Sequence, residues 1–226
     1  DKLYATVYTT DDEASELWEK ETDIDKSHIL RFEKDNFWEM GEVGPCGPCS
    51  ELHIDRGEKH CDKKDVPDHK CRVNGDCARY IELGNLVFIQ YERQKNRDLK
   101  DLSQKHIDVG LGFERIVSCL QDTFSNYDTD LFSPIIKKIE TLTGVKYQDD
   151  EKGMPHRVIA DHIRTLTFAI TDNVVPSNEG RGYVLRRILR RALRYAQVLG
   201  VKEPVLYKLV DSVVEVMGEF FWTVLE

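Results

Sequence analysis

Residues 108–115, DVGLGFER, constrain the fold of this chain more than any other feature. Gly110 and Gly112 stand at alternate positions, and alternate residues of a strand share a face, so a flat ligand could lie against bare backbone there. An amphipathic pattern over residues 113–121 follows and predicts a helix with Arg115 in its first turn. The segment therefore predicts a strand that runs into a helix beside an arginine suited to a phosphate. The same spacing also fits glycines that only relieve crowding and an Arg115 that pairs with neighbours of Glu114.

The remaining periodicity predicts an α+β unit with antiparallel strands, followed by a helical unit. Alternating or continuous apolar runs predict strands at residues 3–8, 36–40, 52–55, 80–91 and 107–111. Helical spacing predicts helices at residues 11–21, 132–142, 156–170 and 182–199, and a last one that begins near Pro204 and includes Phe220. A charged linker before Pro155 places the predicted domain boundary between residues 150 and 151.

Two segments of the first unit interrupt this periodicity. Residues 44–50, GPCGPCS, combine two prolines with two glycines and predict a rigid loop between short strands. Residues 57–76 are polar and irregular, as in an insertion. Four polar residues lie at or just after the end of the first segment: Ser50, Glu51, His53 and Asp55. They fit an exposed strand face better than a site for Mg²⁺ or adenosine, so none of them is assigned to catalysis.

Composition excludes several classes of protein. With 226 residues, 40% of them apolar, the chain can form one large folded domain or two small ones. Its apolar runs stop short of the roughly 18–20 residues that cross a bilayer, so we expect no membrane span. The chain has neither a basic leader nor an initial Met, which indicates a piece of a longer polypeptide. Six cysteines without a signal peptide indicate a reducing, cytoplasmic setting.

Charge is divided unevenly along the chain. The net charge is −9, yet residues 151–226 hold 11 basic and 9 acidic side chains. Residues 181–194 contain six arginines and no acid. On a helix, five of the arginines share one face, and the opposite face is apolar; they are Arg186, Arg187, Arg190, Arg191 and Arg194, opposite Leu185, Ile188, Leu189, Ala192 and Leu193. Such a stripe fits either a solvated surface or a nucleic-acid contact. Any nucleic-acid contact is expected at this stripe and not over the acidic first unit.

Seven blocks, in order, resemble the alanyl-tRNA synthetases, a family of class II aminoacyl-tRNA synthetases. They are residues 36–41 (NFWEMG), 44–51 (GPCGPCSE), 85–88 (NLVF), 106–115 (HIDVGLGFER), 127–132 (YDTDLF), 160–164 (ADHIR) and 180–191 (GRGYVLRRILRR). Residues 106–115 match the third signature motif of class II. The resemblance implies a class II antiparallel sheet flanked by helices, with residues 1–150 the later part of the catalytic domain and residues 151–226 a helical tRNA-recognition domain.

The resemblance implies a ligase that uses ATP and Mg²⁺ to convert alanine to alanyl-adenylate and then transfers the alanyl group to the 3′ end of its tRNA. It implies that Arg115 contacts the γ-phosphate and that Asp108 binds the alanine ammonium by a charge-assisted hydrogen bond. The remaining substrate-binding residues that it implies are Trp38, Asn85, Val87, Gly110 and Gly112. Trp38 and Val87 also fit ordinary strand core. One departure is Gly84, where the family usually carries an aromatic residue.

For the tRNA, the resemblance implies contact with the acceptor stem, including its G·U pair, through phosphates, 2′-hydroxyls and the minor groove. The implied residues are Asn178, Arg181, Arg190 and Arg191, supported by Asp161 and Arg164. The alternative is a non-catalytic tRNA-binding paralogue or a zinc-organised RNA-binding module, neither of which needs Asp108 and Arg115 together. The first two class II motifs are missing, so we expect the isolated chain to lack activity; no oligomeric state is predicted.

The cysteines leave a further question open. Cys46 and Cys49 have the spacing of a zinc knuckle, and later residues could complete a tetrahedral site; they are Cys61, Cys71 and Cys77, with His60 and His69. However, the later cysteines are irregularly spaced, whereas structural zinc sites usually pair two knuckles. The first pair also lies inside the block at residues 44–51. The spacing therefore argues against zinc, and no metal site is assigned.

Overall fold

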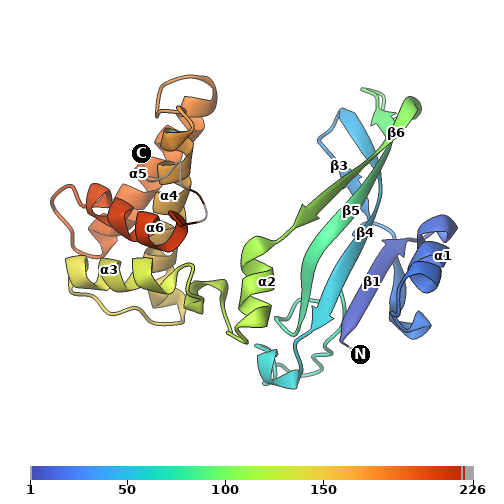
Figure 1. Ribbon diagram of the computed structural model, residues 1–226, viewed down its shortest axis with the longest axis horizontal. Coiled ribbons are helices and arrows are strands. Elements are labelled where there is room, and N and C mark those ends of the chain that lie inside the picture. The colour runs from blue at the N-terminus through green and yellow to red at the C-terminus, as the bar shows by residue number, and fades with distance from the viewer. Residues whose placement is uncertain (1, 220, 222–226) are drawn as a thin grey trace. The chain divides into compact units, whose positions relative to one another are not determined.

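The computed structural model, which describes residues 2–219 and 221, has a sheet in its first part and helices in its second (Figure 1). The chain divides between Asp122 and Thr123 into two units, which are described separately below. The predicted boundary at residues 150 and 151 falls within the second unit, because the helix at Ser133–Thr143 packs against later helices of that unit. The assignment of residues 1–150 and 151–226 to separate functions stays a prediction.

Six strands form one sheet in the first unit. Its order is β2-β1-β4-β5-β6, and β3 also pairs with β4. The strands are β1 (Leu3–Tyr8), β2 (Ile29–Phe32), β3 (Phe37–Glu39), β4 (Gly44–Asp55), β5 (Tyr80–Arg93) and β6 (Leu99–Leu111). All pairs are antiparallel except β1 with β2. The predicted α+β class with a largely antiparallel sheet flanked by helices is therefore confirmed, with one parallel pair that the sequence analysis missed.

Helix α1 (Asp12–Glu21) explains the parallel pair. It connects β1 to β2, and a crossover helix returns the chain in its original direction. Asp11 caps the helix, because its Oδ1 accepts a hydrogen bond from the Ala14 amide at 3.0 Å. The Trp18 indole Nε1 donates to Ser50 Oγ at 2.6 Å and so ties α1 to β4. At the other side of the sheet, α2 (Phe113–Leu120) follows β6 directly, as predicted, and packs against β5.

The structure of β4 corrects the prediction for residues 44–50. They are not a loop but the first half of a 12-residue strand. The pairing of β4 with β5 shifts register between Cys46 and Cys49, which accommodates Pro48, a residue without an amide hydrogen for the ladder. Gly47 lets β5 approach closely, since a Cβ there would lie 2.0 Å from the Phe88 carbonyl oxygen. The glycines and prolines thus specify a bulged strand.

The described part of the second unit contains four α-helices. They are α3 (Ser133–Thr143), α4 (Met154–Thr171), α5 (Gly180–Val198) and α6 (Val210–Met217). Gly144 ends α3 in the left-handed conformation at φ 73°. Helix α4 packs against α3, α5 and α6, and the most deeply buried large side chains include Ile139, Ile159 and Val213. The predicted last helix begins with a short 3₁₀ turn and becomes α-helical at Val210; Phe220 lies outside the described residues.

None of the helices in the described part of the chain combines the length and the apolarity that crossing a bilayer requires.

Candidate active site

One face of β5 and β6 brings together four of the residues predicted to bind alanine. The antiparallel register places Asn85 opposite Gly110 and Val87 opposite Asp108, and directly opposed residues share a face. A Cβ at Gly110 would lie 3.2 Å from Asn85 Oδ1, so the missing side chain leaves room for the Asn85 amide. Asp108 is exposed, and its Oδ1 accepts a hydrogen bond from the Val109 amide at 3.0 Å. This face therefore offers a carboxylate and an amide beside open backbone.

Trp38 stands apart from this group in the sheet. It lies on β3 opposite Gly47 of β4, whereas Val87 lies on β5 opposite Cys49 of β4. One strand therefore separates Trp38 from Val87. Val87 is 5% exposed, as either a pocket wall or an ordinary core residue would be, so its predicted role stays a prediction.

Gly84 shows how closely β5 and β6 approach. A Cβ at this position would lie 2.4 Å from the Gly110 carbonyl oxygen and 2.5 Å from Leu111 Cδ2. The position where the family usually carries an aromatic residue therefore has no space for a side chain in this chain's strand pairing.

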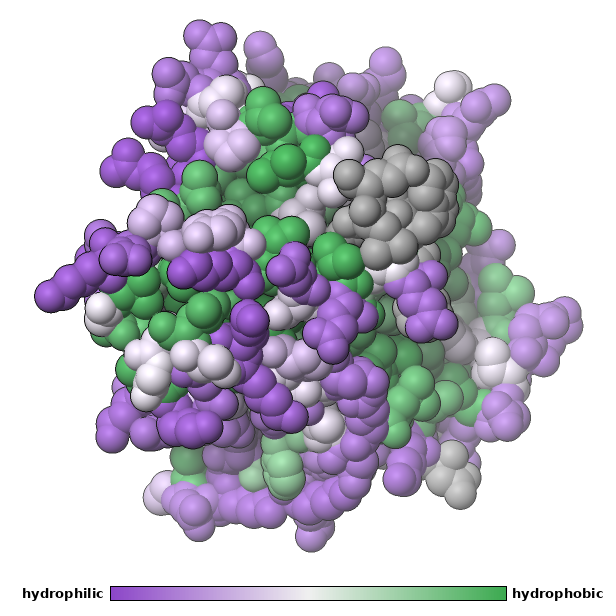
Figure 2. All heavy atoms as spheres, turned by 60° about the vertical axis from the view of Figure 1, so that its left-hand side comes forward, coloured by the Kyte–Doolittle hydropathy of each residue, from purple (hydrophilic) through white to green (hydrophobic). Residues whose placement is uncertain are grey.

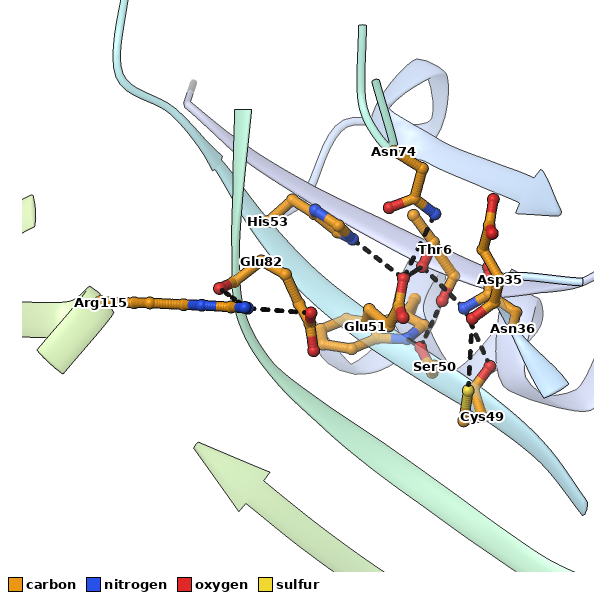
Figure 3. A network of polar contacts seen from close by, with 11 residues as sticks. Thr6, Asp35, Asn36, Cys49, Ser50, Glu51, His53, Asn74, Glu82 and Arg115 are labelled. Carbon is orange, nitrogen blue, oxygen red and sulfur yellow. Dashed lines mark hydrogen bonds and ion pairs between the residues drawn. The ribbon is translucent and has the colours of Figure 1, made fainter. Parts of the chain in front are cut away.

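Arg115 occupies the first turn of α2, as the sequence predicts. Gly112 precedes the helix, and a Cβ there would lie 3.1 Å from Arg115 Cδ, so the glycine leaves room for the arginine stem. Arg115 Nη1 donates to Glu82 Oε2 at 2.9 Å and to the Glu82 carbonyl oxygen at 3.0 Å (Figure 3). Arg115 therefore binds a protein carboxylate, on β5. Its side chain is 47% exposed, and a guanidinium has donors beyond Nη1 that can bind a second anion.

A buried polar network joins β1 and β4 (Figure 3). Glu51 Oε2 lies at its centre and accepts hydrogen bonds from Thr6 Oγ1 at 3.0 Å and Asn74 Nδ2 at 3.3 Å. His53 Nε2 lies 3.1 Å from the same oxygen. Asn36 Nδ2 donates to Thr6 Oγ1 at 2.8 Å and extends the network toward β3. Because Glu51 pairs with Asn85 in the β4–β5 register, this network borders the alanine face.

The interpretation of residues 50–55 as an exposed strand face is wrong. Ser50, Glu51 and His53 are buried, because β4 is an inner strand of the sheet and because α1, through Trp18, and Asn74 contact its side chains. Of these four polar residues only Asp55 is partly accessible, and Arg79 binds it in a bidentate pair at 2.8 and 2.7 Å. The signal that could have revealed the network is a carboxylate and an imidazole two residues apart on a strand, since such residues share a face and can pair.

The environment of Glu51 favours its charged form. Burial raises the pKa of Glu51, but the hydrogen bonds from His53, Thr6 and Asn74 and the charge of His53 outweigh burial, so the pKa lies below its usual value. A carboxyl group with a depressed pKa stabilises the folded state above its unfolded pKa, and that contribution is lost as the pH falls through the folded pKa.

We expect Glu51→Gln to destabilise the protein near neutral pH and to do so progressively less as the pH falls below about 4.3, the usual glutamate pKa. Urea unfolding of both proteins over a series of pH values measures the difference in free energy of unfolding. Glu42→Gln, at an exposed position, is the matched control and should show no such trend. A wild-type to E51Q difference that stays constant with pH would contradict the assignment.

Helix α5 places all six of its predicted arginines at the surface of the second unit, and in the described part of the chain none of them forms an ion pair. A groove runs between α4 and α5. Figure 2, which is turned so that the side with the helical unit comes forward, shows hydrophilic side chains intermixed with apolar ones. The arginines that line the groove are Arg187, Arg190, Arg191 and Arg194. Asn178 and Arg181 are exposed at the start of α5.

The apolar face of α5 matches the prediction only in part. Leu185 and Ala192 are buried as predicted, but Leu193 is 39% exposed and lies in the groove among the arginines. The prediction fails at Leu193 because the face of α5 that is buried in the structure is narrower than the apolar face predicted from its sequence. Arg164 of α4, predicted to support tRNA contacts, places its guanidinium 4.4 Å from the centre of the Phe132 ring.

The five cysteines considered for zinc separate into two groups. Cys46 and Cys49 are buried within β4. Cys61, Cys71 and Cys77 instead converge with His69, and their ligand atoms lie within 4.8 Å of one another. The other histidine considered, His60, binds Asp122 at 3.0 Å. From the sequence, these four residues are considered only as partners of Cys46 and Cys49, whereas the turns of residues 57–79 bring the four side chains together without that pair.

With this geometry in place, comparison with known proteins defines the class. The model of the family described as "tRNA synthetases class II (A)" matches residues 1–226, and the chain belongs to this family. Its curated relatives are more specific. An alanine–tRNA ligase from Chlorobium phaeobacteroides is 56% identical over 225 residues, which are 98% of this chain and 24% of that protein.

Two further relatives carry the same name. An alanine–tRNA ligase from Chlorobaculum tepidum is 55% identical over 227 residues, 98% of this chain and 25% of that protein. One from Lawsonia intracellularis is 48% identical over 221 residues, 97% of this chain and 24% of that protein. The resemblance found in the sequence is thus confirmed, and the chain spans about a quarter of the length of the curated relatives it matches.

Proposed function

We propose that this chain forms part of an alanine–tRNA ligase, which joins alanine to ATP as alanyl-adenylate and then transfers the alanyl group to tRNA. One observation carries the proposal. The exposed carboxylate of Asp108 shares a face of β5 and β6 with Asn85 and Gly110, and the same strand leads into α2 with Arg115 in its first turn. A site for an ammonium and a site for a phosphate therefore adjoin, as the activation of an amino acid requires.

In this proposal Asp108 binds the alanine ammonium, Asn85 holds the substrate over the open backbone of Gly110, and Val87 limits the length of the side chain. Arg115 binds the γ-phosphate of ATP, which orients the α-phosphorus for attack by the alanine carboxylate. The attacking oxygen forms a bond to phosphorus, and pyrophosphate leaves. These residues act by positioning and by charge, so none of them needs to transfer a proton.

Magnesium accompanies ATP in this family, and one carboxylate near Arg115 fits it. Mg²⁺ prefers carboxylate, phosphate and water oxygens, and the Glu82 carboxylate on β5 is such a donor at the edge of the proposed phosphate site. When bound, the ion neutralises charge on the triphosphate. The proposed substrates are alanine, ATP and tRNA, and the six cysteines have free thiols. We therefore place this reaction in the cytoplasm.

The test is alanine-dependent exchange of pyrophosphate into ATP by a protein of the relatives' full length that contains this chain. Exchange that requires alanine supports the proposal. Tight tRNA binding without exchange would instead support the non-catalytic paralogue. The isolated chain serves as a control, and we expect it to show no exchange, because it spans only about a quarter of the length of the curated relatives.

For the tRNA, the exposed arginines of α5 support a contact with the acceptor stem. Affinity for tRNA falls as salt rises, and each phosphate contact contributes roughly 0.7–0.9 to the steepness of log affinity against log salt. We therefore expect replacement of Arg190 and Arg191 by alanine to make this slope shallower by about one to two units. Binding measured over a series of salt concentrations gives this slope. Adenylate formation should stay unchanged.

The matched control for this double variant is Lys202→Ala with Lys208→Ala, which removes two exposed positive charges from the same unit outside the groove. An equal change of slope in both double variants would show that only net charge matters. An unchanged slope in the arginine variant would mean that the stripe is a solvated surface.

A further inference from the structure

We propose that Cys61, His69, Cys71 and Cys77 bind a structural zinc ion that holds residues 57–79 against the sheet. Three sulfur atoms and one imidazole nitrogen form one of the standard donor sets for structural zinc. Their ligand atoms already lie within 4.8 Å of one another. With a zinc–sulfur distance of about 2.3 Å, tetrahedral donors lie roughly 3.5–3.8 Å apart, so a small contraction completes the site.

The surroundings of His69 match those of a zinc-bound histidine. Its Nε2 lies 3.6 Å from Cys71 Sγ, on the side of the cluster, while its Nδ1 lies 3.7 Å from Asp76 Oδ1. A histidine that binds zinc through one ring nitrogen commonly presents the other to a carboxylate, which fixes its tautomer and orientation. Lys63 in turn holds Asp76 at 2.6 Å. One nitrogen thus faces the proposed metal and the other faces its outer carboxylate.

The charge around the cluster also fits. Zinc with three thiolates and a neutral imidazole carries one net negative charge, and coordination releases the three thiol protons to solvent. The Arg79 guanidinium, which binds Asp55, also contacts the Cys71 side chain and places a positive charge beside the centre. Cys61 and Cys77 are 8% and 7% exposed, so most of the site is shielded from water.

A zinc ion would supply what residues 57–79 lack. The segment contains one short 3₁₀ helix and no strand, and its only buried aliphatic side chain is that of Val73. Long irregular segments seldom hold one conformation without a cross-link. This segment nevertheless delivers Asn74 to Glu51 at 3.3 Å. The zinc site would therefore fix a loop that completes the buried network bordering the alanine face.

The experiment is metal analysis of the protein purified under reducing conditions, as wild type and as the variants H69A, H69C, C71S and C119S. We expect about one zinc per chain in the wild type and a loss of at least tenfold in H69A and C71S. H69C keeps a tetrahedral donor set and should retain zinc, which separates loss of a ligand from general misfolding. Cys119 lies outside the cluster, so C119S should keep its zinc.

A second measurement does not depend on how the variants fold. Removal of zinc from the wild type by a chelator should accelerate amide hydrogen exchange in residues 57–79, while β1 and β4 keep most of their protection. Less than about a tenth of an equivalent of zinc in reduced wild-type protein would overturn the proposal. So would equal zinc loss in C119S and C71S, or a disulfide within the cluster shown by a mass lower by two hydrogens.

Discussion

Replacing Arg115 by alanine is expected to lower kcat/KM for ATP in alanine-dependent exchange about 100- to 1000-fold, the range that follows loss of one preorganised charged donor. The KM for alanine should change little, because Arg115 lies at the start of α2, whereas the residues proposed to bind alanine lie on β5 and β6. Arg115→Lys should recover only part of the loss, since lysine keeps the charge but lacks the planar fork. Steady-state exchange kinetics in the full-length protein measure both constants.

The structural role of Arg115 needs its own control, because Arg115 also binds Glu82. Arg31→Ala removes another exposed arginine–carboxylate pair, Arg31 with Asp12 at 2.8 Å, from the edge of the same sheet. If R31A lowered kcat/KM for ATP as much as R115A, the effect would come from stability and the phosphate role would be wrong.

Replacing Asp108 by asparagine is expected to lower kcat/KM for alanine about 10- to 100-fold, since a hydrogen bond to a charged group contributes roughly 1.5–3 kcal/mol. The change keeps the size of the side chain and removes only its charge, so the ammonium loses its ionic partner. Binding of ATP in the absence of alanine should not change. Exchange kinetics over a series of alanine concentrations, together with direct ATP binding, check both statements.

Asp101→Asn provides the matched control for D108N. Asp101 lies on the same strand, is also exposed and pairs across from Tyr91 rather than Val87. It should leave the kinetics for alanine unchanged. A loss in D101N that equals the loss in D108N would indicate a general effect of charge on β6. Unaltered alanine kinetics in D108N would remove Asp108 from the amine site.

The sequence predicted the elements whose signals are local. The strand and helix at residues 108–115 follow from apolar periodicity and from two glycines. The helix occurs where expected, and the strand ends at Leu111 as expected but begins eight residues earlier than predicted, at Leu99. The antiparallel register then aligns β5 with β6. Four of the residues predicted to bind alanine therefore lie on one face without any further information. The family resemblance supplied the roles, which periodicity alone does not contain.

The predictions that failed depend on which strands lie next to each other. Proline and glycine in residues 44–50 favour a turn locally, but close approach of Phe88 to Gly47 makes the segment a bulged strand. Glu51 and His53 resemble exposed residues in sequence, and their burial requires β1 and β5 on either side of β4. The close approach of Cys61, Cys71 and Cys77 also depends on turns that residue spacing does not encode, while the binding of zinc there stays a proposal.

The long connection between β4 and β5 also bears on how fast the sheet can form. Residues 56–79 must close into a loop before the β4–β5 ladder can form, and β1 and β6 pair only with these two strands or with the edge strand β2. Loop closure costs entropy before any distant contact repays it. A ligand that joins Cys61 to Cys77 shortens the segment that must be ordered. If refolding of the first unit is measured with and without added zinc, we therefore expect it to be faster with the proposed zinc ion bound.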